Sequence, residues 1–262
     1  MVGFFIPQTF KRVKFFLEGM KALILAAGYA TRLYPLTENQ PKPLLKIANK
    51  PIVEHILEKI KPIKEIDEVI IVTNARFHHN FQVWLNSFTY PKKITLINDG
   101  TLNNEDRLGA VGEINYILKE EEIKDSLLVI AGDNLFGFSL AKLLSLFSQK
   151  NKSIVAFHDL KELEKVKSKY GVGILDGSKV VGFEEKPIQP KSALASTACY
   201  VFHKNDLPLV EKAIAQGKAD NPGDLVKFLV KNSEVHGFVF DEHWFDVGSF
   251  ESLKAAEELY HK

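Results

Sequence analysis

The sequence predicts an α/β fold, with a Rossmann-like mixed but mostly parallel sheet flanked by helices and a small added β lobe. In the first half of the chain, short apolar runs such as Leu127–Ala131 alternate with helix-period segments such as Ile52–Lys61. This alternation favours βαβ crossovers in an open sheet. Several runs are apolar throughout, as is typical of strands covered on both faces. From Gly171 to Phe202 the strands follow one another closely, which indicates the added antiparallel lobe.

The individual elements follow from the period of the apolar residues and from flanking Pro and Gly. The expected strands are Ala22–Ala26, Glu68–Thr73, Ile94–Ile97, Leu127–Ala131, Ile154–His158, Gly171–Leu175, Val180–Glu184, Ala198–Phe202 and Val235–Phe240. The expected helices are Ile52–Lys61, Phe77–Asn86, Ala110–Lys119, Leu140–Gln149, Asp206–Ala215, Asp224–Val230 and Phe250–Tyr260.

Composition excludes several classes of protein. The chain has 262 residues and a net charge of +1, from 34 basic and 33 acidic residues, so nothing predicts a nucleic-acid or membrane partner. No stretch approaches the roughly 20 apolar residues of a membrane-spanning helix. The single cysteine, Cys199, excludes a disulfide framework and favours a cytoplasmic location. We expect one domain over residues 20–262, and the oligomeric state stays open.

The first 19 residues form an N-terminal extension with three alternative interpretations. The segment carries Lys11, Arg12 and Lys14 beside several Phe. It fits a helix packed on the domain, a basic amphipathic membrane contact, or an artefact of the assigned start site. The last alternative is favoured, with Met20 as the true first residue, because the strand that follows is a natural start for the domain.

A run of small residues follows the first expected strand. Ala27 and Gly28 end the apolar run, and Thr31 and Arg32 come shortly after. Such a turn at the carboxyl end of a strand brings backbone N–H groups close to phosphate oxygens. Lys42, a compact cation between two prolines, adds to the charge of Arg32 and suits a triphosphate. Each feature alone also fits a tight turn with surface charges.

The complete run 22–45, ALILAAGYATRLYPLTENQPKPLL, resembles the nucleoside-diphosphate-sugar pyrophosphorylases. Their opening motif, L-A-x-G-x-G-T-R-L, is followed at this distance by P-K-P. The resemblance implies a sugar-1-phosphate nucleotidyltransferase that joins an NTP and a sugar 1-phosphate and releases pyrophosphate, with Mg²⁺ as cofactor. One departure is Ala30, where the family usually has glycine and where alanine resists a positive φ.

The resemblance also assigns roles to the residues of this run. Ala27, Gly28 and Thr31 are implied to bind the nucleotide, because the family's glycine-rich loop wraps the NTP phosphates. Arg32 and Lys42 are the implied catalytic residues, which stabilise charge as the sugar phosphate attacks the α-phosphorus. These assignments rest on the motif and not on composition or periodicity.

Two aspartates are the expected metal ligands. Asp133 follows the apolar run Leu127–Ala131, and Asp246 lies in the aromatic segment Trp244–Ser249. A carboxylate at the carboxyl edge of a sheet suits Mg²⁺, which takes one or two protein carboxylates plus phosphate oxygens. Each aspartate alone also fits a helix cap or a turn. Both segments resemble the family's G-D and W-x-D-x-G motifs, whose aspartates bind Mg²⁺.

The expected hairpin carries the sugar-phosphate site. Gly171 begins one of its strands, and Glu185 and Lys186 end the other. A Glu-Lys pair is most often an exposed salt bridge, but here it resembles the family's Y-G-V…E-E-K-P segment. The resemblance implies that Glu185 accepts from sugar hydroxyls and that Lys186 binds the phosphate of the sugar. Thr197, on the next strand, is expected to line the same pocket.

Residues 98–113 occupy the family's nucleobase-reading region, and here the match is weak. The chain has RLGAVG at 107–112, where many family members have a Gln or a Pro-rich stretch. Gly109 is expected to let the backbone approach the base. Arg107 fits either a phosphate contact or a cation at a helix start. The choice among dTTP, UTP, CTP and GTP stays open.

Three rival functions remain. The nearest is a cytidylyltransferase of the same fold, acting on an alcohol phosphate such as phosphocholine or inositol 1-phosphate, although the hairpin favours a sugar. A non-catalytic homologue that senses nucleotides would be expected to have lost Arg32, Lys42 or one aspartate, and all of them are present. An NAD-binding protein would carry G-x-G-x-x-G in the first turn, which this chain lacks.

Overall fold

The computed structural model of the chain describes residues 19–218 and 220–261. The alternatives for the N-terminal extension, residues 1–19, stay predictions, because all of it except Gly19 lies outside these ranges. The first described strand, β1, spans Met20–Leu25, two residues earlier than expected. Within the described ranges, every helix is too short or too polar to cross a membrane.

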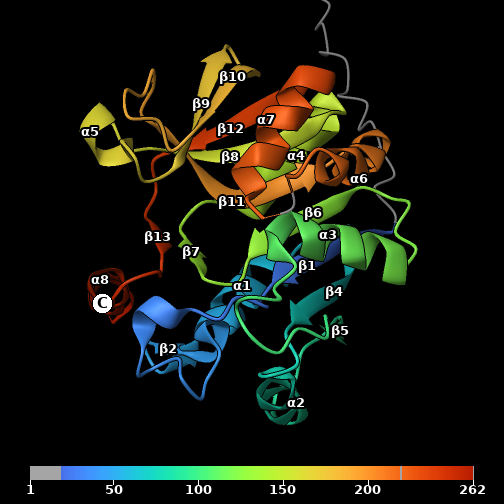
Figure 1. Cartoon of the computed structure of the whole chain (residues 1–262), viewed down its shortest axis with the longest axis vertical. Coiled ribbons are helices and arrows are strands. Elements are labelled where there is room, and N and C mark those ends of the chain that lie inside the picture. Colours follow the sequence, from blue (N-terminus) through green and yellow to red (C-terminus); the bar gives the residue numbers. More distant parts are fainter. Residues whose placement is uncertain (1–18, 219, 262) are drawn as a thin grey trace, which may run out of the picture.

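A nine-stranded sheet forms the centre of the molecule (Figure 1). The strands β1, β4, β5 and β6 are parallel neighbours, β12 is parallel to β8, and β11 is antiparallel to both β6 and β8. The expected mixed, mostly parallel sheet is confirmed. In spatial order the strands are β5 (Lys93–Asn98), β4 (Ile66–Thr73), β1, β6 (Leu127–Ala131), β11 (Leu194–Phe202), β8 (Ser153–Asp159), β12 (Val235–Phe240), β10 (Lys179–Glu185) and β9 (Gly171–Asp176).

The added lobe is smaller than the sequence suggested. The antiparallel hairpin β9–β10 lies at the end of the sheet and projects away from it beside the short helix α5, Leu163–Val166 (Figure 1). However, β11, which we expected to continue this lobe, lies in the middle of the sheet between β6 and β8. A strand that follows a hairpin in sequence can pair with distant strands, and the local periodicity of its residues does not show which strands it will pair with.

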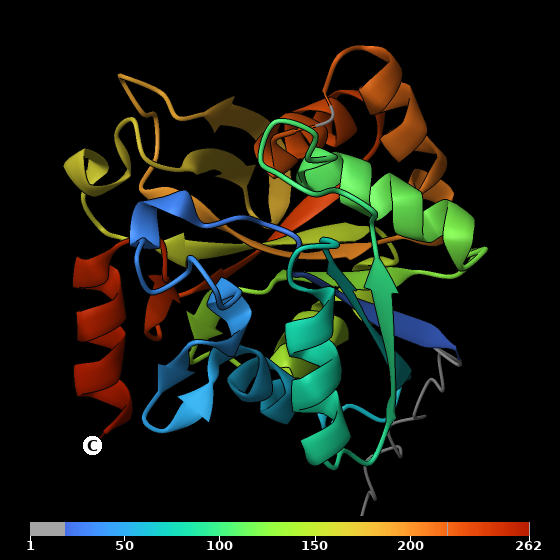
Figure 2. The same ribbon diagram turned by 60° about the horizontal axis from the view of Figure 1, so that its bottom comes forward.

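Helices cover both faces of the sheet, because alternate side chains of each strand point to opposite faces. Ala22 and Ile24 of β1 belong to one apolar cluster with α1, α2, α4 and α8, while Leu23 belongs to a second cluster with α3, α6 and α7. Figures 1 and 2 both show α3, α6 and α7 together on one side. The helices are α1 (Ile52–Ile60), α2 (His78–Ser87), α3 (Gly109–Glu120), α4 (Leu140–Lys150), α6 (Pro208–Ala215), α7 (Pro222–Asn232) and α8 (Phe250–Tyr260).

Several short elements were not predicted from the sequence. They include two small two-stranded sheets, one made of β2 and β3 and the other of β7 and β13. Strands of two or three residues show no measurable period, so apolar patterning cannot reveal them. These elements are β2 (Lys46–Ile47), β3 (Lys50–Pro51), β7 (Asn134–Phe136), β13 (Trp244–Asp246) and the 3₁₀ turns η1 (Thr31–Leu33), η2 (Lys42–Leu44) and η3 (Lys204–Asp206).

Asn134 joins the small β7–β13 sheet to the central sheet. Its side chain is 2% exposed; its amide nitrogen donates to the carbonyl of Thr197 in β11, and its amide oxygen accepts from Trp244 Nε1 in β13 at 3.0 Å. Buried amides of this kind fix the relative position of the segments that they connect. Asn134 therefore sets where β13 lies against the end of β6.

We predict that Asn134→Ala lowers the free energy of unfolding by about 1–3 kcal/mol, because it leaves the buried groups of Thr197 and Trp244 without their partner. Chemical denaturation with urea measures this difference. Asn232→Ala is the matched control, since the amide of Asn232 donates to the Phe228 carbonyl at 2.8 Å from the exposed end of α7. Equal losses in the two variants would contradict the linking role of Asn134.

Candidate active site

A cavity of about 300 Å³ opens at the carboxyl ends of β1 and β6. Five of the residues expected at the site line it, namely Gly28, Arg32, Lys42, Gly109 and Asp133. They come from the loop after β1, the η1 and η2 turns, the start of α3 and the end of β6. Ligands of open α/β sheets bind at this edge, so the cavity is the candidate active site.

Two oppositely charged groups that line the cavity are in direct contact. Lys42 Nζ lies 2.5 Å from Asp133 Oδ2, and the two side chains are 14% and 24% exposed. Gly132 makes this approach feasible, because a Cβ at this position would lie 2.8 Å from the Leu25 carbonyl oxygen. The loop after β6 can therefore pack directly on the end of β1, which brings Asp133 within reach of Lys42.

Asp246 reaches the same place from the other end of the chain. In the β7–β13 pair, Asp246 is opposite Asn134, and the Val247 amide donates to the Asp133 carbonyl at 3.2 Å. Part of its side chain stays open to solvent, yet the surrounding protein and the Asp133 carboxylate raise the pKa of Asp246 to about 6. The positive charges of Lys42 and Arg32 act in the opposite direction. The two aspartates thus face each other closely enough to interact.

The donor set fits a hard divalent cation. Two carboxylates, with open space beside them for phosphate oxygens and water, match the way in which Mg²⁺ is bound in phosphate-transfer sites. Within residues 19–218 and 220–261, no group of three or more His, Cys, Asp and Glu side chains could hold a metal ion. A cation at Asp133 and Asp246 would therefore complete its coordination with other oxygen ligands, such as water and phosphate oxygens.

Arg32 lies near Asp246 at the entrance. Its guanidinium is exposed, and the position that a Cβ would take on Gly248 is 3.7 Å from Arg32 Nη2 and 3.5 Å from Asp246 Oδ1. The Arg32 guanidinium and the Asp246 carboxylate therefore both lie beside Gly248. Because Arg32 is largely solvent-facing, its guanidinium fork is free to contact an anionic ligand.

The loop between β1 and η1 is held by its own contacts. Ala27 is buried, and its carbonyl accepts from Asn74 Nδ2 at 2.8 Å. Ala30 adopts the left-handed conformation, with φ of 49°, and its carbonyl accepts from Thr37 Oγ1 at 2.7 Å. Gly28 and Thr31 are exposed on this loop. The chain therefore holds an alanine in a conformation that favours glycine, because hydrogen bonds on both sides fix the turn.

Gly109 opens α3 with a positive φ of 73°, which glycine adopts without strain. The next amide, of Ala110, donates to the Asp220 carbonyl at 3.0 Å. Arg107 Nη2 pairs with Asp220 Oδ2 at 2.9 Å, so Arg107 is engaged with a carboxylate in this structure. Both Arg107 and Asp220 line the cavity, where they close the side formed by α3 and the start of α7.

Glu185 is tied to the start of α7. Glu185 is opposite Gly171 in the β9–β10 hairpin, and its Oε1 accepts from Asn221 Nδ2 at 2.9 Å. A Cβ on Gly223 would lie only 1.8 Å from Glu185 Oε2, so a larger residue there would displace the Glu185 carboxylate from this position. Asn221 stands between Asp220 and Pro222, both of which line the cavity. The hairpin end is thus connected to the cavity, although Glu185 and Gly171 do not line it.

Lys186 and Thr197 are placed differently from the rest of the expected set. Lys186 is exposed just beyond β10, and its amide donates to the Tyr170 carbonyl at 3.2 Å. Thr197 is 1% exposed, and its hydroxyl donates to the Ala156 carbonyl at 3.0 Å inside the sheet. Ala198, its neighbour in an irregular part of β11, lines the cavity instead. The roles of Lys186 and Thr197 in sugar binding stay predictions.

Sequence reasoning did not single out Asn221, Gly223 and Glu113. Asn221 and Gly223 were detectable in part, since N-P-G before an apolar run is a helix-start signal, but their contact with Glu185 is not local. Glu113 gave a clearer signal. It is a charged residue at a position of α3 that the helical period assigns to the buried face, and it lines the cavity.

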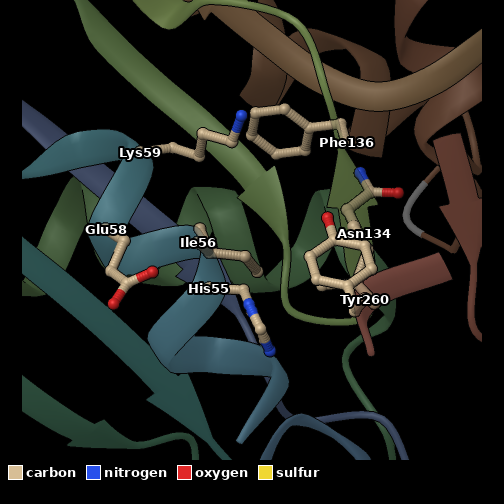
Figure 3. Close-up of a pocket in the computed structure, with 8 residues that line it drawn as sticks. His55, Ile56, Glu58, Lys59, Asn134, Phe136 and Tyr260 are labelled. Carbon is tan, nitrogen blue, oxygen red and sulfur yellow. The ribbon is translucent and has the colours of Figure 1, made fainter. Parts of the chain in front are cut away.

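A second cavity of about 140 Å³ lies between α1, β7 and α8 (Figure 3). Figure 3 shows His55 and Lys59 of α1 facing Phe136 and Tyr260 across it. Lys59 Nζ donates to the Gly137 carbonyl at 3.1 Å, and burial lowers the pKa of this amine. None of the expected site residues lines this cavity. The candidate active site is therefore the larger cavity.

Comparison with known proteins places the sequence among nucleotidyl transferases. The family described as nucleotidyl transferase matches residues 21–262. The chain is 31% identical over 246 residues to the bifunctional protein GlmU of Methanocaldococcus jannaschii, covering 93% of this chain and 55% of that protein. It is 28% identical over 235 residues to a putative mannose-1-phosphate guanyltransferase of Sulfolobus acidocaldarius, covering 87% of this chain and 60% of that protein. The chain thus spans little more than half the length of these curated relatives.

Solved structures share the fold. A putative glucose-1-phosphate thymidylyltransferase from Bacillus anthracis aligns with a TM-score of 0.79 and 23% identity, over 93% of this chain and 96% of that one. An apo UDP-glucose pyrophosphorylase aligns with a TM-score of 0.79 and 22% identity, over 92% of this chain and 98% of that one. The fold expected from the sequence is confirmed.

We predict that Ala30→Gly raises the free energy of unfolding by up to about 1 kcal/mol, because relief of the left-handed strain exceeds the entropy cost of glycine. Thermal and urea denaturation measure this change. Ala255→Gly, at an exposed site in the middle of α8, should have the opposite sign and cost about 1 kcal/mol. A loss of stability in Ala30→Gly would show that Ala30 is not strained.

Proposed function

Because the chain belongs to the nucleotidyl transferase family, we propose that it transfers a nucleoside monophosphate from an NTP to a sugar 1-phosphate and releases pyrophosphate. One observation carries this proposal. Arg32, Lys42 and Asp133, which come from two separate segments of the sequence, line one cavity, and Asp246, from a third segment, lies beside Asp133 and Arg32. This combination of fixed cations and two carboxylates is what transfer between phosphate groups requires.

The sugar 1-phosphate is favoured over an alcohol phosphate by the relatives. One is named a putative mannose-1-phosphate guanyltransferase, and another, from Synechocystis, a UTP–glucose-1-phosphate uridylyltransferase that is 28% identical over 239 residues. The β9–β10 hairpin supports the same acceptor, because its Glu185 carboxylate could accept from sugar hydroxyls and Lys186 could pair with phosphate. Gly171 and Thr197 belong to this proposed sugar side.

We propose Mg²⁺ as the cofactor, held by Asp133 and Asp246. The mutual repulsion that helps to raise the pKa of Asp246 would be relieved by a divalent cation between the two carboxylates. When bound, the metal would supply charge neutralisation at the phosphates. The contact between Lys42 and Asp133 supports a role for the Lys42 amine at the same phosphates.

The protein's own groups act by positioning and by charge. In our proposal Gly28 and Thr31 offer backbone and hydroxyl donors to the triphosphate, while Arg32 and Lys42 offset the negative charge that builds up at the α-phosphorus. The acceptor attacks through a phosphate oxygen, which is already ionised at neutral pH. No general base is therefore needed, and no covalent enzyme intermediate forms.

We place the reaction in the cytoplasm. Cys199, the single cysteine of the sequence, is fully buried in β11, and burial raises the pKa of its thiol. A buried, protonated thiol is an apolar filler and not a nucleophile. A fold that uses no disulfide suits a reducing compartment, which is also where NTPs are abundant.

The direct test is pyrophosphate release with Mg²⁺, with dTTP, UTP, CTP, GTP and ATP each combined with glucose 1-phosphate, mannose 1-phosphate, phosphocholine and inositol 1-phosphate. We expect release with a sugar 1-phosphate. Release only with CTP and an alcohol phosphate would establish the cytidylyltransferase instead. No release with any pair would contradict both assignments.

We predict that Lys42→Ala and Asp246→Asn each reduce turnover by about 10²–10³-fold, because each removes charge stabilisation near the transferred phosphorus. We also expect Mg²⁺ with an NTP to raise the melting temperature of the wild type, and much less that of Asp246→Asn. Asp67→Asn, at the exposed amino end of β4, is the control and should leave both properties unchanged. Normal turnover in a folded Lys42 or Asp246 variant would refute these roles.

A further inference from the structure

Glu113 is a charged residue on the buried face of α3. It shares this face with Val111, Ile114 and Ile117, and it lies one helical turn from Gly109. Its side chain is only 7% exposed, and what remains accessible lines the active-site cavity. An apolar residue at this position would pack without cost, whereas a buried carboxyl needs partners. The requirements of folding therefore do not explain why residue 113 is a glutamate.

Glu113 lacks such a partner in the described part of the chain. Among residues 19–218 and 220–261, no donor hydrogen-bonds its carboxyl oxygens. Burial, together with the nearby Asp99, raises the pKa of Glu113 to about 8. Asp99 Oδ1 accepts from both the amide and the hydroxyl of Thr101, each at 2.8 Å. The other oxygen of Asp99, the buried Oδ2, has no partner among the described groups. This end of the site thus contains acceptors that lack donors.

The rest of the cavity shows what could supply those donors. Arg32, Lys42 and Asp133 account for the phosphates and the metal. The remaining lining includes the small residues Ala26, Gly28, Gly109 and Ala110, followed by Glu113. These small residues leave room for a planar ring on the wall next to Glu113, where α3 packs against β1, while Arg107, Asp220 and Pro222 also line the cavity. The part of an NTP that lies beyond its phosphates and ribose is the base.

We propose that Glu113 selects guanine, by accepting hydrogen bonds from the ring N1–H and the 2-amino group. This inference rests on the proposed function, because it assigns the base of the NTP used at the same site. A carboxylate accepts through both oxygens and donates through neither. Guanine is the base whose pairing edge places an N–H next to an NH₂, so the two groups match.

The other bases place an acceptor against the carboxylate. Uracil and thymine flank their N3–H with carbonyl oxygens, while cytosine and adenine set a ring nitrogen acceptor beside their amino group. When Glu113 is ionised, each of these pairings leaves an acceptor facing an acceptor in a buried site, which is strongly unfavourable. Because the pKa of Glu113 is about 8, its carboxyl is mostly protonated at pH 7 without a ligand, and two donors from guanine would lower this pKa and favour the ionised form.

Nucleotide binding tests this assignment independently of turnover. Calorimetric dissociation constants are measured at pH 9, above the pKa of Glu113, with Mg²⁺, for GTP, UTP, dTTP, CTP and ATP and for inosine triphosphate, which lacks only the 2-amino group of GTP. We expect GTP to bind at least about tenfold more tightly than each of the others, since one bidentate base contact gives this much discrimination. Equal binding of GTP and inosine triphosphate, or tighter binding of another NTP, would overturn the proposal.

The matched variants are Glu113→Gln and Glu120→Gln. Both remove one negative charge from α3, but Glu120 is exposed at the end of the helix. A glutamine at 113 offers one acceptor and one donor, which match the N3–H and O4 of uracil. We expect Glu113→Gln to lower the GTP-to-UTP preference at least about tenfold, and Glu120→Gln to leave it unchanged.

Melting temperatures confirm that both variants fold. A folded Glu113→Gln that keeps the wild-type preference contradicts the role of Glu113. If the wild type releases pyrophosphate from UTP but not from GTP, the proposed function stands and this inference fails. If the protein binds GTP selectively through Glu113 but releases no pyrophosphate with any acceptor, this inference stands and the proposed function fails.

Discussion

Two like-charged carboxylates, Asp133 and Asp246, have to be held close together, and this requirement shapes the structure around them. Their repulsion opposes the arrangement, so the backbone must impose it. The β7–β13 pair does so by setting Asp246 opposite Asn134, the neighbour of Asp133. Lys42 then offsets part of the charge at 2.5 Å from Asp133. Stability is given up locally, and under the proposed function this arrangement would give a cation and phosphates ligands that are already in place.

The fold was predictable where its determinants are local. Apolar runs such as Leu127–Ala131 located the buried strands, and the period of Ile52–Lys61 located a helix to within one residue. The position of β11 between β6 and β8 was not predictable, since strand order depends on contacts between distant segments. The three-residue strands β7 and β13 were also missed, because their register comes from the Asn134 and Trp244 contact and not from a pattern of their own.

The candidate site, like the fold, was predictable only where its determinants are local. Arg32, Lys42 and Asp133 follow strands or turns with recognisable sequences, so their place at the cavity was expected and the structure places them there. Glu185 could be named, but its connection to Asn221 on another element could not. Motifs record the chemistry of a residue together with its local backbone, whereas the partners that hold the residue are chosen by the tertiary fold.

The central place of β11 has a consequence for how the chain is made. During synthesis β1, β4 and β6 emerge early and can pair, yet the other edge of β6 stays open until β11 follows, and β8 waits for both β11 and β12. Open edges of apolar strands readily pair with other chains. A nascent chain that has passed Ala131 but not yet Phe202 is therefore the species most exposed to aggregation, and the cell's chaperones would be needed most during that interval.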